Sequence, residues 1–193
     1  MNKNTLPFAL VHFDVWGPSP ISIGYGVRWF VIFVDNCTYM TWLYLMKHKD
    51  EVLHVFQSFH VMIQTQFSSK LRVLRFDNGG EYVNQRFHTY FEHHGLVHET
   101  LCPQTPQQNG IAERKHCHIL ETARALLHEM HVPPHYWSDA ESTAVHLLNR
   151  LPFKVLNFKT PLQVLASHVS LPTTLMLPPR VFGCVAYVHL HKN

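Results

Sequence analysis

The sequence predicts an α/β fold: a five-stranded mixed sheet, made of an antiparallel meander plus parallel strands, with helices on both faces. The first sign is a series of three apolar runs joined by short turns, which is typical of a meander. The second is a pair of shorter apolar runs that alternate with segments of helical periodicity. With 193 residues, 46% of them hydrophobic, the chain is long enough for one domain of about 150 residues with extensions.

The meander is predicted from three runs that are rich in β-branched and aromatic residues. They lie at residues 10–16, 28–34 and 39–46. The first run is followed by Gly17 and Pro18, a pair that ends a strand. The second run is nearly continuous in apolar residues, so we expect it to be buried on both faces.

The middle of the chain alternates helices and strands. The predicted elements are a helix over 50–67, a strand over 71–76, a helix over 84–95 and a strand over 96–101. Asp50 and Asn84 are predicted to cap the two helices, and Gly95 to end the second one. In the first helix the apolar residues recur at steps of three and four, which indicates one buried face.

The last third of the chain is predicted to be mainly helical. The predicted elements are helices over 106–130, 135–150 and 162–166, and a lone strand over 181–190. The first of these helices begins either near Pro106, where the sequence fits a capping box, or only near Asn109. Its expected apolar face comprises Ala112, Ile119, Leu120, Ala123, Leu126, Leu127 and Met130. Glu113 lies about 100° from Ala112, on the rim of that face, where a carboxylate can line a cleft.

Composition narrows the class of protein without assigning a function. The net charge of +3 and the isoelectric point near 8.7 permit contact with DNA but do not indicate it. The four cysteines lie far apart, without a Cys-x-x-Cys pair, which argues against a zinc ribbon and a disulfide framework. No apolar run approaches the ~20 residues of a membrane span, so we expect a soluble, intracellular protein.

Three carboxylates stand where a metal site can form. Asp14 ends the first predicted strand, Asp77 follows the fourth, and Glu113 lies 36 positions after Asp77, in the first turn of a helix. Each has an ordinary alternative: a strand-end aspartate, a turn aspartate and a solvated helix charge. Brought together, the three would repel one another unless cations filled the cluster. Oxygen ligands of this kind favour Mg²⁺ or Mn²⁺.

Four segments resemble a known family. They read HFDVWGP, RFDNGGEY, PQTPQQNGIAERKH and RVFGCVAYV. These segments resemble the integrase core of copia-type long-terminal-repeat retrotransposons, a family within the retroviral integrase and ribonuclease H-like superfamily. The resemblance covers roughly residues 10–166 and implies a ribonuclease H-like fold. It also implies that Asp14, Asp77 and Glu113 are a catalytic triad holding two Mg²⁺ or Mn²⁺ ions for phosphoryl transfer on DNA.

The resemblance also implies the partners. These are DNA, as element ends and as target, and further copies of the chain in a homo-oligomer; integration would take place in the nucleus, and no membrane is involved. The residues implied in DNA binding are Gln107, Asn109 and Gly110 in a loop, then Arg114, Lys115, His116 and His118 on the following helix. For the four helix residues, an exposed face without a DNA role remains the alternative.

Two positions depart from the family pattern. Relatives carry Ser where this chain has Phe76, whose side chain we expect to pack on the sheet face opposite to Asp77. Relatives also carry Asn-Arg where this chain has His116 and Cys117, which removes a positive charge. Two alternatives to an integrase therefore stay open. One is a catalytically inactive relic or nucleic-acid-binding module, and the other is a ribonuclease H-like nuclease.

The predicted domain organisation has three parts. Residues 1–9 form an N-terminal tail, 10–166 the catalytic core, and 167–193 a linker and the truncated start of an SH3-like domain. The zinc-binding module that precedes the core in relatives is not expected here. We therefore interpret the chain as a fragment of a polyprotein.

Overall fold

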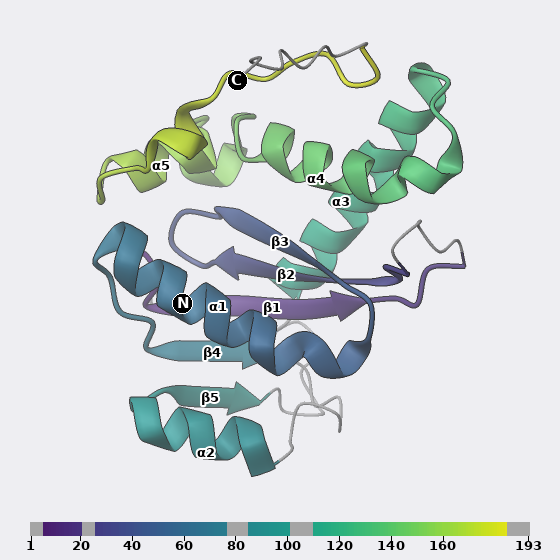
Figure 1. Ribbon diagram of the computed structural model, residues 1–193. Coiled ribbons are helices and arrows are strands. Elements are labelled where there is room, and N and C mark those ends of the chain that lie inside the picture. The colour runs from purple at the N-terminus through teal and green to yellow at the C-terminus, as the bar shows by residue number, and fades with distance from the viewer. Residues whose placement is uncertain (1–5, 21–25, 77–84, 101–109, 185–193) are drawn as a thin grey trace, which may run out of the picture.

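A computed structural model describes residues 6–20, 26–76, 85–100 and 110–184. Within these residues, five strands form one sheet in the order β3-β2-β1-β4-β5 (Figure 1). The strands are β1 (Leu10–Trp16), β2 (Trp29–Asp35), β3 (Thr41–Met46), β4 (Val73–Phe76) and β5 (Val97–Thr100). The first three pair antiparallel, whereas β4 runs parallel to β1 and β5 parallel to β4. The predicted meander with added parallel strands is confirmed.

Helices cover both faces of this sheet. They are α1 (Val52–Phe67), α2 (Gln85–His94), α3 (Gly110–Glu129), α4 (Trp137–Leu148) and α5 (Pro161–Ala166). In Figure 1, α1 crosses in front of the sheet, while α3 rises behind it to meet α4. Short 3₁₀ turns occupy Lys49–Glu51, Pro134–Tyr136, Lys154–Leu156 and Thr173–Met176.

The start of α1 differs from the prediction. Asp50 does not cap this helix, because it lies inside the 3₁₀ turn that precedes α1. The carboxylate of Glu51 instead accepts a hydrogen bond from the backbone nitrogen of His48, at 3.0 Å. Glu51, the third residue of the turn, thus satisfies the free backbone N–H of His48, and Asp50 does not act as the cap. Asn84, the predicted cap of α2, lies outside the described residues.

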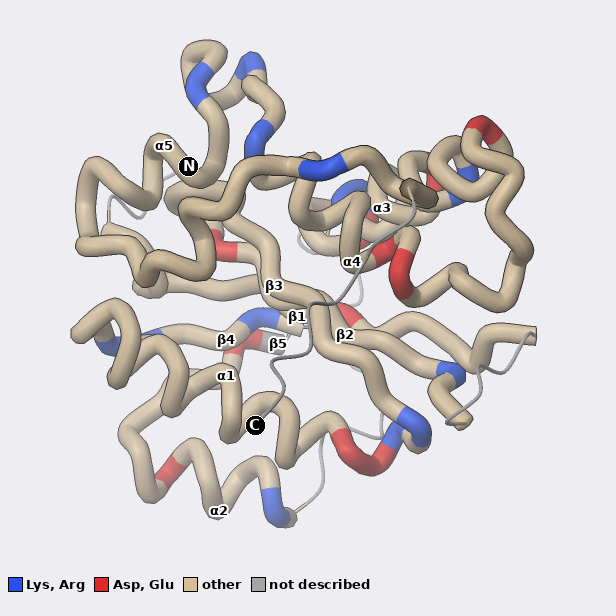
Figure 2. The backbone as a smooth tube through the Cα atoms, turned by 45° about the horizontal axis from the view of Figure 1, so that its top comes forward, with Lys and Arg blue, Asp and Glu red and all other residues tan. Residues whose placement is uncertain are grey.

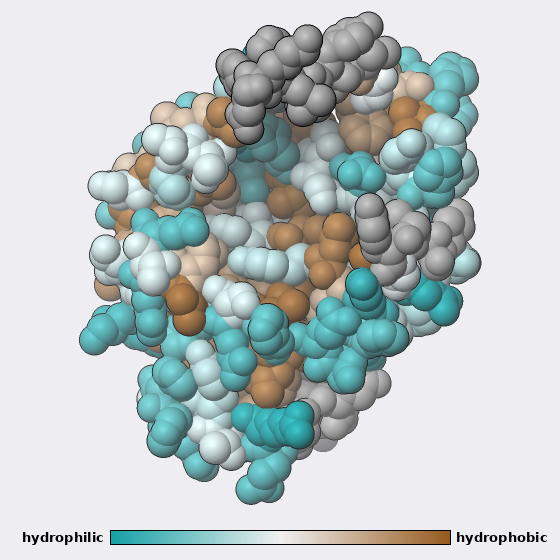
Figure 3. All heavy atoms as spheres, viewed as in Figure 1, coloured by the Kyte–Doolittle hydropathy of each residue, from teal (hydrophilic) through white to brown (hydrophobic). Residues whose placement is uncertain are grey.

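The hydrophobic core is divided by the sheet into two clusters. β2 contributes to both, because successive side chains of a strand point to opposite faces. Val31 and Phe33 belong to the cluster that also holds residues of α1 and α2, and Phe30, Ile32 and Val34 belong to the cluster that holds residues of α3 and α4. All five are fully buried, as the continuous apolar run predicts. On the outside, apolar side chains gather in the hollow between α1 and the helices above it (Figure 3).

The cluster under α1 is dominated by phenylalanine rings. Phe33 stacks on Phe59 at a centroid distance of 4.1 Å, and Phe76 meets the edge of Phe13 at 4.8 Å. Phe76 is 1% exposed and also contacts Phe87 of α2. The expectation that Phe76 packs into the core is confirmed.

The chain beyond α4 returns across the molecule in short turns. Thr160 caps α5, as its Oγ1 accepts a hydrogen bond from the nitrogen of Gln163 at 3.0 Å. Residues 181–184 form a turn rather than the start of the predicted strand over 181–190, and the rest of that strand lies outside the described residues. Within the described ranges, no helix has the length and apolar character needed to cross a membrane.

Candidate metal and nucleic-acid site

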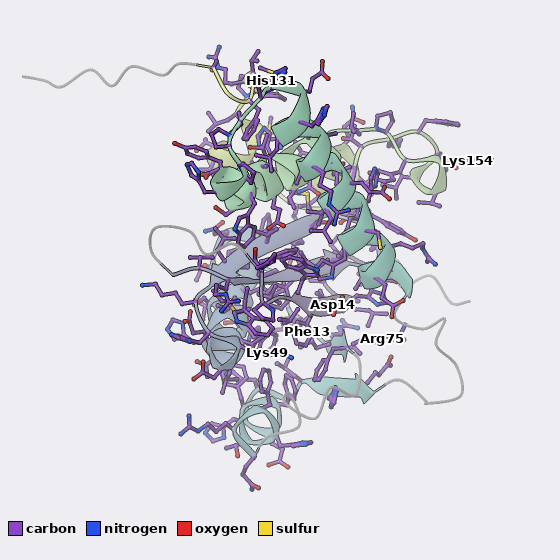
Figure 4. All side chains as sticks on the ribbon, turned by 90° about the vertical axis from the view of Figure 1, so that its right-hand side faces the viewer. Phe13, Asp14, Lys49, Arg75, His131 and Lys154 are labelled. Carbon is purple, nitrogen blue, oxygen red and sulfur yellow. The ribbon has the colours of Figure 1, made fainter. Side chains whose placement is uncertain are left out.

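Asp14 occupies the face of β1 that looks toward α3. Its neighbour Phe13 points the other way, into the cluster under α1, because side chains alternate along a strand. Figure 4 shows Asp14 near the end of the sheet, beneath the start of α3. The side chain of Asp14 is 20% exposed, so the carboxylate is sheltered but reachable from solvent.

Both carboxylate oxygens of Asp14 already have partners. Oδ1 accepts a hydrogen bond from the backbone nitrogen of Val15 at 2.9 Å. Oδ2 lies 2.6 Å from Nδ1 of His116, a residue of α3 that is 102 positions away in the sequence. This contact ties β1 to α3 and fixes the orientation of the carboxylate.

His116 is a buried residue of α3. It is 6% exposed, and its ring meets the ring of Phe30 edge-on at 4.9 Å. Its Nε2 has no hydrogen-bond partner among the described residues. The interpretation of His116 as part of an exposed helix face is therefore wrong, and its contact with DNA phosphates remains a prediction. A signal was present: His116 lies four residues after Ala112 and three before Ile119, the spacing of one helix face.

Lys115 is also buried, although it was expected on an exposed face that meets DNA. It is 5% exposed, and its ammonium group lies 4.4 Å from the ring centre of Phe153. Burial lowers the pKa of the Lys115 side chain to about 8. The ring offers the ammonium a cation–π contact in place of water. Contact between Lys115 and DNA remains a prediction.

The other predicted residues of α3 lie at its start or on its exposed side. Glu113, which was predicted to lie on the rim of the buried face, is exposed, and so are Arg114 and His118. Gly110 is the first residue of α3 and is buried; a Cβ atom there would lie 2.8 Å from Nη1 of Arg114. The Arg114 side chain thus folds back over Gly110. Asp77, Gln107 and Asn109 lie outside the described residues.

The end of β4 lies beside the end of β1. In the parallel register His12 faces Arg75, and the two following phenylalanines, Phe13 and Phe76, are in ring contact. Arg75 forms an ion pair with Glu99 of β5, with Nη2 and Oε2 2.5 Å apart. Arg75 lies on the same side of the molecule as Asp14 (Figure 4). Sequence reasoning missed this cross-strand pair, because only the register of β4 and β5 brings the two residues together.

The donor atoms suit a hard divalent cation. Asp14 and Glu113 offer carboxylate oxygens, the ligand type that Mg²⁺ and Mn²⁺ prefer. Across the parts of the chain that the structure describes, no group of three or more His, Cys, Asp or Glu side chains is placed to hold a metal ion. The third predicted ligand, Asp77, is not among those residues. The two described carboxylates fit such an ion but do not form a complete site by themselves.

Comparison with known proteins assigns the family. A family model described as "Integrase core domain" matches residues 4–106, more than half of the chain; the match ends before Glu113. The chain is 40% identical over 184 residues to the Retrovirus-related Pol polyprotein from transposon TNT 1-94 of Nicotiana tabacum. That match covers 95% of this chain and 14% of the polyprotein. The corresponding polyprotein from transposon RE1 of Arabidopsis thaliana is 41% identical over 185 residues, or 96% of this chain and 12% of its own length.

Solved structures agree on the fold. A chain of the simian T-cell lymphotropic virus intasome in complex with PP2A regulatory subunit B56 gamma superposes with a TM-score of 0.68 at 18% identity, covering 93% of this chain and 59% of that one. The HTLV-2 integrase catalytic core domain in complex with magnesium (trimeric form) gives 0.61 at 20% identity, covering 82% of this chain and 97% of that one. The mixed sheet with helices on both faces is therefore the ribonuclease H-like fold of retroviral integrase cores. This chain belongs to the integrase core domain family, within a retrotransposon Pol polyprotein lineage.

Proposed function

We propose that this chain is the catalytic core of an enzyme that trims a DNA end and joins it to target DNA by phosphoryl transfer. The observation that carries the proposal is the contact between Asp14 and His116. Because of it, the carboxylate of β1 reaches the helix that bears Glu113. Glu113 precedes His116 by three residues, and residues three apart are neighbours on a helix surface. Two of the three candidate carboxylates therefore belong to the same side of the sheet.

The ends of β1 and β4 support the third member of the triad. Asp14 and Asp77 each follow directly, in the sequence, one of the two phenylalanines that touch across these strands. Parallel neighbouring strands end at the same edge of a sheet, which is where ligands collect in open α/β sheets. We therefore propose Asp77 as the ligand between Asp14 and Glu113.

The chain's own residues would orient the reacting groups. When bound, Mg²⁺ or Mn²⁺ ions, two by our proposal, supply an activated attacking oxygen and neutralise the charge of the leaving oxygen. His116 holds one oxygen of Asp14 in a fixed direction, and Glu113 stands exposed at the start of α3. Arg114 and His118, both on the exposed side of this helix, are available to bind DNA phosphates.

The wider setting is proposed from the relatives. The chain spans about one-seventh of the length of the tobacco polyprotein that it matches. We propose that its activity is likewise that of one part of a larger protein. We propose residues 10–166 as the core and 167–193 as a linker followed by the start of an SH3-like domain. The partners would be element ends and target DNA in the nucleus. A joining enzyme must hold two DNA ends, which favours a homo-oligomer.

The test is metal-dependent cleavage and joining of labelled DNA ends by the chain. Asp77→Asn and Glu113→Gln are expected to abolish both reactions in Mg²⁺ and in Mn²⁺, because each removes a charged metal ligand. Glu121→Gln is the matched control, since Glu121 is an exposed carboxylate farther along α3. If Glu113→Gln retained the activity of Glu121→Gln, the proposed triad would be wrong.

Product analysis separates the two alternatives. One observation favours an inactive nucleic-acid-binding module: both oxygens of Asp14 are already engaged, by Val15 and His116. Such a module would bind DNA but neither cut nor join it under any metal condition. A ribonuclease H-like nuclease would cut without joining, and would accept an RNA strand paired with DNA.

A further inference from the structure

Charge is distributed unevenly along the chain. Residues 142–193 contain no Asp or Glu but five basic residues: Arg150, Lys154, Lys159, Arg180 and Lys192. Residues 1–141 carry 11 basic residues against 13 acidic ones, a net charge of −2. Figure 2 shows the consequence in space, because the described tube beyond α4 carries blue segments only. A basic segment free of carboxylates is typical of a surface that meets a polyanion.

Two of these five residues lie together on one short loop. The loop spans residues 151–160, contains Lys154 and Lys159, and is called the basic loop from here on. Figure 4 shows Lys154 projecting from the body of the molecule beside α3. Arg150, just before the loop, serves the fold instead: its guanidinium donates to the backbone oxygens of His146, Leu175 and Leu177. The lysines are exposed and available to a partner.

The basic loop is held in shape by its own backbone. The nitrogen of Phe153 donates to the oxygen of Lys159 at 3.1 Å, and the nitrogen of Phe158 donates to the oxygen of Phe153 at 3.0 Å. Further backbone bonds join Leu156 to Phe153 and Asn157 to Lys154. A loop closed in this way holds its backbone in a set geometry, so little backbone entropy is lost when its side chains bind.

At the tip of the loop, an aromatic ring faces solvent. Phe158 is 72% exposed and has a φ of 59°, in the left-handed region. Its neighbour Asn157 has a φ of 54°, which asparagine tolerates, whereas a bulky residue in this region is an outlier. The backbone of Phe158 is thus strained, and its ring belongs to neither of the two hydrophobic clusters of the described residues. Strain of this kind occurs at ligand-binding positions, where the residue is kept for its contacts.

The basic loop sits against the helix of the candidate site. Phe153, at its base, contacts the ammonium of Lys115 at 4.4 Å and the ring of His118 at a centroid distance of 6.2 Å. Both residues belong to α3, and His118 lies about 7.5 Å along the helix axis from Glu113. Through these contacts of Phe153, the basic loop continues the surface of α3 on the side away from Glu113.

We propose that the basic loop is a nucleic-acid contact of this chain, next to the catalytic side of α3. Lys154 and Lys159 bind successive phosphates, and the ring of Phe158 stacks on an unpaired base. An exposed aromatic residue between cations is the combination that binds single strands, because every base has a flat face. The inference rests on the proposed function, because that function is the reason for choosing DNA as the ligand. The DNA would be a single strand at a frayed or overhanging end.

The test is fluorescence anisotropy of a labelled DNA duplex with a short single-stranded overhang, titrated at several salt concentrations without divalent metal. Lys154→Ala/Lys159→Ala is expected to lower the slope of log affinity against log salt by about 2, since two phosphate contacts are lost. The matched control is Lys47→Ala/Lys70→Ala, which removes the same charge from exposed positions before and after α1. An equal fall in slope for both double variants would overturn the proposal.

Substitution of Phe158 provides a second test, in which thermal stability is measured together with binding. Phe158→Asn is expected to raise the thermal stability, because asparagine tolerates a positive φ, and to weaken binding of the overhang about fivefold or more. Phe158→Trp keeps a ring and is expected to retain binding. If Phe158→Asn bound as well as the parent chain, or changed only the oligomeric state in sedimentation, the loop would not be a nucleic-acid contact. Stronger loss on single-stranded RNA than on DNA would identify RNA as the partner.

The two proposals fail separately. If DNA cleavage depended on Glu113 but every loop variant bound DNA as well as the parent chain, the proposed function would stand and the role of the basic loop would be refuted. Binding that depends on the loop, with no metal-dependent reaction, would refute the proposed function alone. No binding of nucleic acid by the parent chain would refute the loop's role and the choice of DNA together.

Discussion

Replacement of Glu141 by glutamine is expected to stabilise the fold, by an amount that grows with pH. Glu141 lies on α4 and is 3% exposed, on the buried side that it shares with Ser138 and Val145. Its Oε2 has no hydrogen-bond partner among the described residues. Burial raises the pKa of the Glu141 carboxyl from 4.5 to about 8. The group is therefore protonated in the folded chain at neutral pH, but ionised in the unfolded one.

The magnitude follows from proton linkage. The folded chain holds the Glu141 proton more tightly than the unfolded chain does. The contribution of this group to the free energy of unfolding is therefore fully present below pH 4.5 and is lost as the pH rises toward 8. Each unit of pKa difference corresponds to 1.36 kcal/mol, so at neutral pH the loss is about 3 kcal/mol. Glu141→Gln keeps the shape and removes the ionisation. It is expected to raise the melting temperature near neutral pH by about 6–12 °C.

The assay is urea unfolding followed by tryptophan fluorescence, with Trp137 one helical turn from Glu141 as a reporter. Free energies of unfolding for the parent chain and Glu141→Gln are compared at about pH 5 and about pH 8. The difference should be small at the lower pH and should rise to about 4–5 kcal/mol at the higher one. Glu141→Leu serves as a second variant that fills the site without any polar atom.

Glu129→Gln is the matched control, since Glu129 is an exposed carboxylate at the end of α3. It should change the free energy of unfolding by no more than about 0.5 kcal/mol at either pH. A difference between the parent chain and Glu141→Gln that stays constant from low to high pH would refute the reasoning. It would mean that Glu141 ionises in the folded chain, with water or a rearranged side chain as its partner.

Two further predictions concern contacts between distant parts of the chain. His116→Ala is expected to weaken Mn²⁺ binding by about 10–100-fold, because the hydrogen bond that orients Asp14 is lost, while His116→Asn keeps a donor and retains most of the affinity. Calorimetric titration with Mn²⁺ measures this, and tighter binding by His116→Ala would show that the imidazole competes with the ion. Asn149→Ala is expected to lower the free energy of unfolding by at least about 2 kcal/mol. Its amide makes two buried bonds to the backbone of Thr41, at 3.0 and 2.7 Å, which join the end of α4 to β3. Urea unfolding measures the loss, and a value within about 0.5 kcal/mol of the parent chain would contradict it.

Local sequence signals predicted the regular elements well. The run of β-branched and aromatic residues identified β1 over Leu10–Trp16, and the continuous apolar run identified β2 within one residue. Pro161 after Thr160 indicated the start of α5, and Gly95, with a φ of 62°, follows the end of α2 as predicted. These signals act over a few residues, through backbone preferences and periodic burial, so they need no knowledge of the partner element.

Side-chain environments were predicted less well, and the failures share one cause. Lys115 and His116 were assigned to an exposed face of α3, yet both are buried, and Glu141 is a charged residue type inside α4. Residue type usually indicates exposure, but the burial of a helix position depends on which neighbouring elements cover it. α3 packs against β1 and β2 on one side and against α4 on another. Neighbouring elements therefore cover more of its circumference than they cover on a surface helix.

The sequence alone predicted the order of the strands and α-helices from β1 to α5, the two-faced apolar pattern of the sheet and the three carboxylates that suggest metal-dependent chemistry. Only the tertiary structure decided that His116 of α3 binds Asp14 of β1 across 102 positions, and that Phe153 seats the basic loop on the same helix. Periodicity and turn preference are properties of short segments, which a single chain reveals directly. Contacts between segments far apart in the chain are decided by how the sheet and its helices pack, because packing alone sets which side chains meet.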